Sequence, residues 1–222
     1  MNHLWEVFGL GNKLRVIELV LMRMISSLAA LYRGRSQYGK YKKLYKRDLL
    51  KVPSFKLISS LAYGRILDVG CGIGYLSKLF NDYVGIDINK EAIAIAKRNT
   101  NSNYIIASAT HLPFRSNVFD TCISYDVIEH VKNVDPMLTE MKRVSKKAII
   151  SCVDFNSYYR FFTYDETHQK LLTPNELLLT LKKWFAHVRL FRTSGLFLVP
   201  YFLNAFLSRY LPNQVVLEAC KR

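Results

Sequence analysis

The sequence is poor in the residues that build disulfide-linked or zinc-stabilised domains. Its 222 residues contain four cysteines, at positions 71, 122, 152 and 220, and no two of them form a C-x-x-C pair. The spacing therefore indicates neither a zinc knuckle nor a disulfide framework, and a reducing, cytoplasmic compartment is expected. The first residues also lack the basic, apolar and small-residue succession that is typical of a secretory signal peptide.

Long uninterrupted apolar runs are missing as well. Residues 14–32 are apolar but include three charged side chains, and residues 195–212 are very apolar but include two prolines and an arginine. A transmembrane helix needs about 20 predominantly apolar residues, and neither segment meets this requirement cleanly. We therefore predict no membrane span and interpret residues 195–212 as an apolar insertion.

Acidic residues are scarce, since 17 aspartates and glutamates stand against 32 lysines and arginines, a formal net charge of +15. Residues 1–64 carry a net +9 and residues 182–222 a net +6, whereas residues 65–181 hold 13 basic and 13 acidic side chains. The middle of the chain has the charge balance of an enzyme core. Its basic flanks suit an anionic partner such as lipid headgroups or nucleic acid; a solvated basic surface without such a partner is the alternative.

An alternation of strand-like and helix-like segments begins at Arg65. Strands are expected at residues 65–69, 83–87, 104–107, 121–124, 148–152, 186–191 and 215–219. Helices are expected at residues 75–80, 90–99, 136–144 and 174–183, the last with a capping signal at Thr173-Pro174. This alternation predicts an α/β fold, a doubly wound, mostly parallel seven-stranded Rossmann-like sheet with helices on both faces.

The chain is long enough for one α/β domain with an appendage and too short for two domains of ordinary size. Residues 1–64 are predicted to form a basic helical N-terminal extension, with a break near residues 33–35. In this segment Tyr38, Tyr41 and Tyr45 recur at helical spacing, which is typical of a packing face. Residues 65–222 are predicted to form the catalytic domain.

The most specific signal lies in residues 66–74, which read I-L-D-V-G-C-G-I-G. An apolar strand leads into three alternate glycines, which let the backbone turn sharply and lie against a ligand. The spacing is G-x-G-x-G rather than the G-x-G-x-x-G of dinucleotide-binding folds. The run therefore predicts a nucleotide-sized cofactor pocket and disfavours an NAD-linked oxidoreductase.

Three further motifs follow in order. They are V-G-I-D-I at residues 84–88, S-A-T-H-L-P-F at residues 108–114 and Y-D-V-I-E-H-V at residues 125–131. With these four motifs the chain resembles the class I S-adenosylmethionine-dependent methyltransferases, in particular their large small-molecule branch. The resemblance is strong over residues 65–147 and looser over residues 171–219.

The resemblance implies S-adenosylmethionine as the cofactor and suggests which residues hold it. Asp68 would accept hydrogen bonds from the methionine ammonium, and Asp87 would accept both ribose hydroxyls. Ile88 and Leu112 would cover the two faces of the adenine. The other implied cofactor-binding residues are Gly70, Cys71, Gly72, Gly74, Ser108 and Ala109.

One position departs from the family pattern. An acid usually precedes the alanine of the third motif, where it binds the adenine amino group, and this chain has Ser108 there. A serine can still accept that hydrogen bond, but a neutral acceptor gives a weaker bond than a charged one. Cofactor binding is therefore expected to survive with lower affinity.

Methyl transfer from a sulfonium requires alignment of the acceptor and, for a hydroxyl, removal of its proton. His130 is a candidate base at the carboxyl edge of the sheet, and Asp126 would share its helical face if residues 126–131 were helical. His168 is a second candidate, in a later loop. Bracing of the fold is the competing interpretation for these residues. Glu129 and His130 would diverge on a helix, so no metal site is predicted.

The acceptor is inferred from composition. Residues 155–164 interleave six aromatic side chains with one arginine, which could stack nucleobases or line an apolar pocket. Together with residues 195–212, they favour the second interpretation. We predict methyl transfer to a small-molecule acceptor, hydrophobic or lipid-linked, by a cytoplasmic protein in peripheral contact with an anionic membrane. The alternatives are an RNA methyltransferase that uses the basic flanks and a non-catalytic S-adenosylmethionine-binding protein.

Overall fold

The computed structural model describes residue 50, residues 52–154, residue 169, residues 172–193 and residues 214–221. All of these residues lie in one compact unit, residues 41–222. Its helices are α4 (Pro53–Leu61), α5 (Lys90–Asn99), α6 (Val134–Val144) and α8 (Pro174–Trp184), with short 3₁₀ helices η2 (Tyr75–Leu79) and η3 (Ile128–His130). Its strands are β1 (Ile66–Val69), β2 (Tyr83–Asp87), β3 (Asn103–Ile106), β4 (Phe119–Tyr125), β5 (Ser145–Val153), β6 (His187–Thr193) and β7 (Gln214–Cys220).

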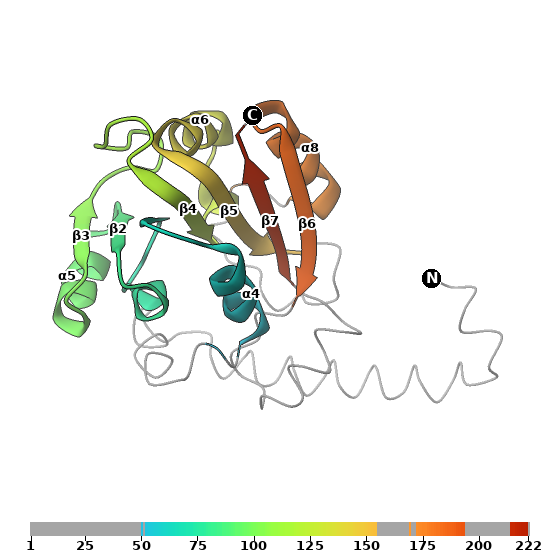
Figure 1. Cartoon of the computed structure of the whole chain (residues 1–222). Coiled ribbons are helices and arrows are strands. Elements are labelled where there is room, and N and C mark those ends of the chain that lie inside the picture. Colours follow the sequence, from blue (N-terminus) through green and yellow to red (C-terminus); the bar gives the residue numbers. More distant parts are fainter. Residues whose placement is uncertain (1–49, 51, 155–168, 170–171, 194–213, 222) are drawn as a thin grey trace, which may run out of the picture. The chain divides into compact units, whose positions relative to one another are not determined.

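The seven strands form one sheet in the order β3-β2-β1-β4-β5-β7-β6 (Figure 1). Strands β1 to β5 pair in parallel, and β7 is antiparallel to both β5 and β6. The predicted doubly wound, mostly parallel sheet is confirmed. The chain runs outward from β1 through β2 to β3 and then returns to the other side of β1 at β4. Ligands of doubly wound folds bind at such a reversal, outside the carboxyl ends of the strands.

Helices cover both faces of the sheet, and each face has its own apolar core. On one face, α6 and α8 bring Met137 and Leu177 against the sheet. On the other face, α4 and α5 contribute Phe55 and Ile93. Because both faces are covered, all four residues of β1 are buried, as expected for a central parallel strand.

Local sequence signals explain where the helices begin. The Asn89 side chain accepts hydrogen bonds from the backbone N–H groups at the start of α5, and Thr173 forms a capping box with Glu176 at the start of α8. Helix α6 begins two residues before the predicted Pro136, because Asn133 caps it through the backbone N–H of Asp135. The helix predicted for residues 75–80 is a single 3₁₀ segment, η2.

Helix α4 lies in the part of the chain expected to belong to the N-terminal extension, yet it packs on the sheet. The ring of Phe55 lies 4.7 Å from that of Tyr125 between centroids, and the hydroxyl groups of Ser54 and Tyr125 are hydrogen-bonded at 3.1 Å. Both Ser54 and Phe55 are buried. The last residues before β1 therefore contribute to the core of the catalytic domain.

Several predicted features lie outside the described residues and stay predictions. They are the rest of the N-terminal extension with its tyrosines, His168, the aromatic residues 155–164 and the apolar residues 195–212. Within the described ranges, no helix is both long enough and apolar enough to cross a membrane.

Candidate active site

The glycine run turns the chain at the carboxyl end of β1. The backbone N–H groups of Gly70 and Cys71 both donate to the carbonyl of Ile86, each at 2.8 Å, which ties the turn to β2. Glycines 70, 72 and 74 all have positive φ, a conformation that L residues rarely adopt. A Cβ added at Gly70 would overlap the Val127 side chain, whereas one added at Gly72 would meet no atom of the described residues within 4 Å. Gly72 therefore faces open space that a ligand can fill.

Asp87 holds this turn from the end of β2. Its Oδ2 accepts from the Gly72 backbone N–H and its Oδ1 from the Asn89 backbone N–H, both at 2.8 Å. The next side chain, Ile88, is 74 % exposed, which is unusual for an isoleucine. An acid that holds the glycine turn and an exposed apolar side chain thus follow each other at the end of β2, and their predicted contacts with ribose and adenine stay predictions.

Asp68 is buried within the same edge. Its Oδ2 accepts a hydrogen bond of 2.5 Å from the hydroxyl of Tyr83, at the start of β2. Its other oxygen, Oδ1, is buried and has no hydrogen-bond partner among the described residues. Burial raises the pKa of Asp68 to about 7, the Tyr83 hydrogen bond opposes this rise, and the charge of Asp87 adds to it. A buried acceptor without a partner is rare and fits a ligand that donates to it.

Cys71 lies beside Asp68 and contributes mainly through its backbone. Its side chain is buried, and its Sγ lies against the β2 backbone at Gly85. Burial, followed by the charges of Asp68 and Asp87, raises the pKa of the thiol far above its usual range. The side chain is thus a structural thiol rather than a nucleophile.

The third motif forms a loop after β3. The hydroxyl of Ser108 accepts from the Thr110 backbone N–H at 3.3 Å and lies 2.9 Å from the Thr110 hydroxyl. Ala109 is partly buried against the core, and Leu112 is buried in it. Ser108 therefore shapes this loop, and Leu112 presents most of its side chain to the protein.

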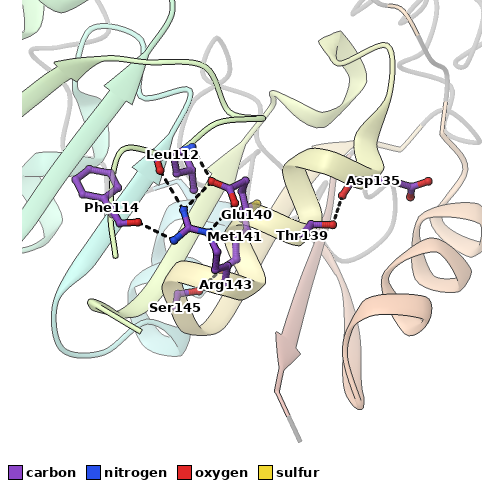
Figure 2. Close-up of polar contacts among 8 residues, drawn as sticks. All are labelled: Leu112, Phe114, Asp135, Thr139, Glu140, Met141, Arg143 and Ser145. Atoms are coloured by element: carbon purple, nitrogen blue, oxygen red, sulfur yellow. Dashed lines mark hydrogen bonds and ion pairs between the residues drawn. The ribbon is translucent and has the colours of Figure 1, made fainter. Parts of the chain in front are cut away.

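A clamp formed by Glu140 and Arg143 of α6 holds this loop in place (Figure 2). Arg143 donates to the carbonyls of Phe114 and Leu112, at 2.7 and 3.0 Å, and pairs with Glu140. Glu140 in turn accepts from the Leu112 backbone N–H at 2.8 Å. The clamp satisfies three backbone groups of a loop that has no regular secondary structure.

The fourth motif is not the helix that would bring Asp126 and His130 onto one face. Asp126 has a positive φ of 53°, and only Ile128–His130 form a 3₁₀ helix. The Asp126 backbone N–H is tied to the Ser151 carbonyl at 3.0 Å, and its Oδ1 accepts from the Gln214 side chain at 2.8 Å. The turn places Asp126 against β5 and β7, so the proposed alignment of His130 by Asp126 has no helical basis.

Glu129 lies close to Asp126 and is almost completely buried. Among the described residues, neither of its carboxylate oxygens has a hydrogen bond of good geometry, although the backbone N–H groups of Glu129 and Val153 lower its pKa somewhat. Burial raises the pKa of both acids, and the charge of Asp126 raises that of Glu129 further. The two carboxyl groups therefore resist ionising together, as like charges in a dry site do.

A chain of hydrogen bonds links this acid pair to helix α4. The Tyr125 hydroxyl donates to Gln214 Oε1 at 3.0 Å and is bonded to Ser54, while the Gln214 amide donates to Asp126. Gln214 begins β7, far from the other three residues in sequence. It fixes the direction of an acid at the carboxyl edge of the sheet, and the next residue, Val127, lies against Gly70 of the glycine run.

The sequence missed Tyr83, Gln214, Glu140 and Arg143 as site residues. Their spacing carries no signal, because each acts on a group from a different element. Glu129 was considered only as a metal ligand or a bracing residue, and its burial cannot be read from the motif. Within the described part of the chain, no group of three or more histidine, cysteine or acidic side chains is arranged to hold a metal ion.

Comparisons with known proteins agree with this geometry. Residues 67–150 match the family model of a methyltransferase domain. The chain is 37 % identical over 108 residues to an uncharacterized protein of Methanocaldococcus jannaschii, covering 48 % of this chain and 43 % of that protein. It is 31 % identical over 129 residues to a ubiquinone biosynthesis O-methyltransferase of Pelagibacter ubique, covering 49 % and 53 %. The chain thus spans about half the length of the curated relatives it matches.

The fold is shared with solved structures. The crystal structure of an S-adenosylmethionine-dependent methyltransferase from Thermotoga maritima superposes with a TM-score of 0.66 and 19 % sequence identity. The match covers 84 % of this chain and 95 % of that one. At this level of identity, the likeness extends to the fold.

Proposed function

The chain carries a class I S-adenosylmethionine-dependent methyltransferase domain, and we propose that this domain transfers a methyl group from S-adenosylmethionine to a small-molecule acceptor. The proposal rests above all on one observation. At the carboxyl end of β1, Gly72 faces open space, and Asp68 of the same strand is buried with one oxygen that has no hydrogen-bond partner among the described residues.

The residues at this edge suit the three parts of the cofactor. Asp68 Oδ1 can accept from an ammonium group, as the resemblance implied. The carboxylate oxygens of Asp87 already accept from the backbone N–H groups of Gly72 and Asn89, and each can accept a further hydrogen bond from a ribose hydroxyl. The exposed Ile88 offers an apolar surface to a base. Ser108 is engaged with Thr110, so its contribution to adenine binding is weaker than that of the usual acid.

The bound sulfonium would supply an already activated methyl group, so the protein's task is to align the acceptor and manage its proton. Asp126 and Glu129 follow β4 at the carboxyl edge of the sheet, and one of them can hold a proton while the other accepts one. Gln214 orients Asp126. His130 follows at the end of the 3₁₀ helix η3 and remains a candidate base.

The acceptor class is proposed from the flanks of the domain. The apolar residues 195–212 and the net charges of +9 and +6 on the two flanks together suit a hydrophobic or lipid-linked acceptor at an anionic surface. Among the relatives, the Pelagibacter enzyme is named for ubiquinone biosynthesis, which supports an apolar acceptor.

The test begins with the donor. Isothermal titration should show binding of S-adenosylmethionine, and no binding at about millimolar ligand, corresponding to less than about 4 kcal/mol, would reject the whole assignment.

The acceptor is tested separately. The protein is incubated with methyl-labelled cofactor and with lipid, RNA, protein and polar-metabolite fractions, and label is expected in the lipid or small-molecule fractions. Label confined to RNA, with binding that weakens steeply with salt, would favour the RNA alternative. Flotation with anionic liposomes at low salt tests the membrane contact. Absence of flotation would reject the membrane contact and leave the methyltransferase proposal unchanged.

A further inference from the structure

We propose that Tyr83 is a positioning residue for the cofactor: its hydroxyl holds one oxygen of Asp68, so that the other oxygen is presented to the cofactor's ammonium group. The inference deepens the proposed function and rests on it.

The geometry separates the two oxygens of one carboxylate. The Tyr83 hydroxyl donates to Asp68 Oδ2 at 2.5 Å, and both side chains are at least 97 % buried, with exposures of 3 % and 1 %. Asp68 Oδ1 has no partner among the described residues. One strong hydrogen bond therefore fixes the direction of the acid, and its other oxygen can accept from a further donor such as the ammonium group of a ligand.

The tyrosine reaches this position from the far end of its strand. Tyr83 is the first residue of β2 and pairs with Ile66, whereas Asp68 pairs with Gly85. A Cβ at position 85 would collide with Cys71 Sγ and with the Tyr104 ring, so the glycine leaves room for both groups beside Tyr83. The Tyr83 ring also makes an edge-on contact with Tyr104, with centroids 6.0 Å apart, which limits its rotation.

The groups around Asp68 set its proton affinity. Burial raises the pKa of Asp68 to about 7, the nearby charge of Asp87 acts in the same direction, and the Tyr83 hydrogen bond opposes both. Cys71, Tyr83, Tyr104 and Cys122 are the other titratable groups near Asp68. Burial, together with the charge of Asp68, raises the pKa of each, so all four are neutral near pH 7. Without a ligand, Asp68 therefore titrates near neutrality, and an ammonium ligand favours its ionised form.

A purely structural role for Tyr83 would have a different consequence. Loss of a buried hydrogen bond lowers the free energy of unfolding, but it does not by itself change the pH dependence of ligand binding. A positioning role also changes the pH at which an ammonium-bearing ligand binds, because removal of the hydroxyl raises the pKa of the acid to which the ligand must bind. The pH dependence of affinity distinguishes the two roles.

The experiment titrates the full chain with S-adenosylhomocysteine from about pH 5.5 to about pH 8.5. A parallel titration uses methylthioadenosine, which has the same nucleoside but no amino-acid part. The variants are Tyr83→Phe, Asp68→Asn and Tyr104→Phe. The last is the matched control, because it removes a buried hydroxyl from the same core cluster without touching Asp68.

For the unaltered protein, the affinity for S-adenosylhomocysteine should fall below about pH 7, approaching a tenfold loss for each pH unit. Tyr83→Phe should move this midpoint to higher pH and weaken binding at neutral pH by about tenfold, while Tyr104→Phe leaves the midpoint in place. In Asp68→Asn, the affinity for S-adenosylhomocysteine should no longer depend on pH in this range, because the titrating acid is absent. Methylthioadenosine should bind with the same affinity to Tyr83→Phe and to the unaltered protein.

The outcomes separate this inference from the proposed function. If S-adenosylhomocysteine binds but Tyr83→Phe leaves its pH midpoint unchanged, or weakens methylthioadenosine equally, the positioning role is wrong and the methyltransferase proposal stands. If neither ligand binds to the unaltered protein, the proposed function itself fails.

Discussion

The two halves of the carboxyl edge of the sheet are built in different ways. The donor half, at the ends of β1 and β2, takes its glycines and acids from residues 68–88, one continuous stretch. The acceptor half, at the ends of β4 and β5, joins Asp126 and Glu129 to Gln214 of β7 and, through Tyr125, to Ser54 of α4. The donor half is thus specified by local sequence, and the acceptor half by contacts between distant elements.

This difference has a physical reason. A cofactor shared by many enzymes needs a fixed backbone turn, and glycine spacing imposes such a turn locally. Acceptors differ, and the side chains around them can come from any element that reaches the edge of the sheet. Variants in the two halves should therefore have different effects.

The largest effect is expected from the glycines of the donor half. Gly70→Ala and Gly72→Ala both place a Cβ at positive φ, which costs about 1 to 3 kcal/mol. Only the Cβ at position 70 collides with Val127, so Gly70→Ala should lose about 1 to 3 kcal/mol more through overpacking. Gly72→Ala should remain folded but lose affinity for S-adenosylhomocysteine by about tenfold or more.

Urea unfolding and titration calorimetry measure these two effects separately. Unaltered affinity in a folded Gly72→Ala variant would show that the cofactor does not lie against Gly72. It would also contradict the assignment of cofactor binding to the donor half.

The pH dependence of stability comes next, because both halves contain acids with raised pKa. For Asp68, Asp126 and Glu129, the folded protein binds the proton more tightly than the unfolded chain, so stability falls as the pH rises from the unfolded value of about 4 through the folded value. The melting temperature of the ligand-free protein should therefore be lower at about pH 8 than at about pH 5.5.

Ligand addition separates the contributions of the two halves. S-adenosylhomocysteine should raise the melting temperature more at the higher pH, because its ammonium group stabilises ionised Asp68, and Asp68→Asn should remove this difference. A melting temperature that rises across the same interval would contradict the assignment of these acids as protonated in the ligand-free protein.

An intermediate effect is expected at Gln214, in the acceptor half. Gln214→Leu removes the donor to Asp126 Oδ1 and leaves this half-buried acid without that partner, at a cost of about 1 to 3 kcal/mol. Methyl transfer should fall by about tenfold to a hundredfold. The affinity for S-adenosylhomocysteine should stay within about twofold, since Gln214 does not contact the donor half.

Labelled-methyl transfer and calorimetry on the same preparation measure the two quantities. Ser54→Ala, at the other end of the hydrogen-bond chain, should lower methyl transfer less than Gln214→Leu does. Loss of cofactor affinity in parallel with activity would mean that the two halves are not separable.

The smallest effect is expected at the clamp on the third-motif loop. Arg143→Ala removes the bonds to the Leu112 and Phe114 carbonyls, and because the side chain is about one-third exposed the loss should be about 1 kcal/mol. Cofactor affinity should weaken by a few-fold through the loosened loop. Lys142→Ala, at the adjacent position of the same helix, is the control and should change neither quantity; equal effects of the two variants would exclude a specific role for the clamp.

Sequence patterns predicted the sheet well, because strands buried on both faces read as apolar runs between turn signals. The strand at Tyr83–Asp87 and the helix at Lys90–Asn99 have the predicted boundaries. Strands β4 and β5 extend beyond their predicted ends, since pairing continues at Phe119 and Tyr125 of β4 and at Ser145 and Lys147 of β5. Such extensions depend on partners that a local pattern does not contain.

The turn at Asp126 shows most clearly where local reasoning fails. The residues that follow Asp126 are compatible with a helix, but the Ser151 carbonyl and the Gln214 amide hold this residue at positive φ. Both partners come from later strands. Tertiary hydrogen bonds therefore decide the backbone conformation here, against a local preference worth only a fraction of a kcal/mol per residue.

The sequence by itself determined the α/β sheet, the glycine turn and the two acids, Asp68 and Asp87, near the carboxyl ends of β1 and β2. It could do so because strand burial and glycine conformation are local properties. Only the tertiary structure decided that Tyr83 occupies one oxygen of Asp68, that Gln214 holds Asp126, and that Glu129 is buried without a good hydrogen-bond partner. Hydrogen bonding and burial of these groups depend on which distant side chains the fold brings within about 3 Å.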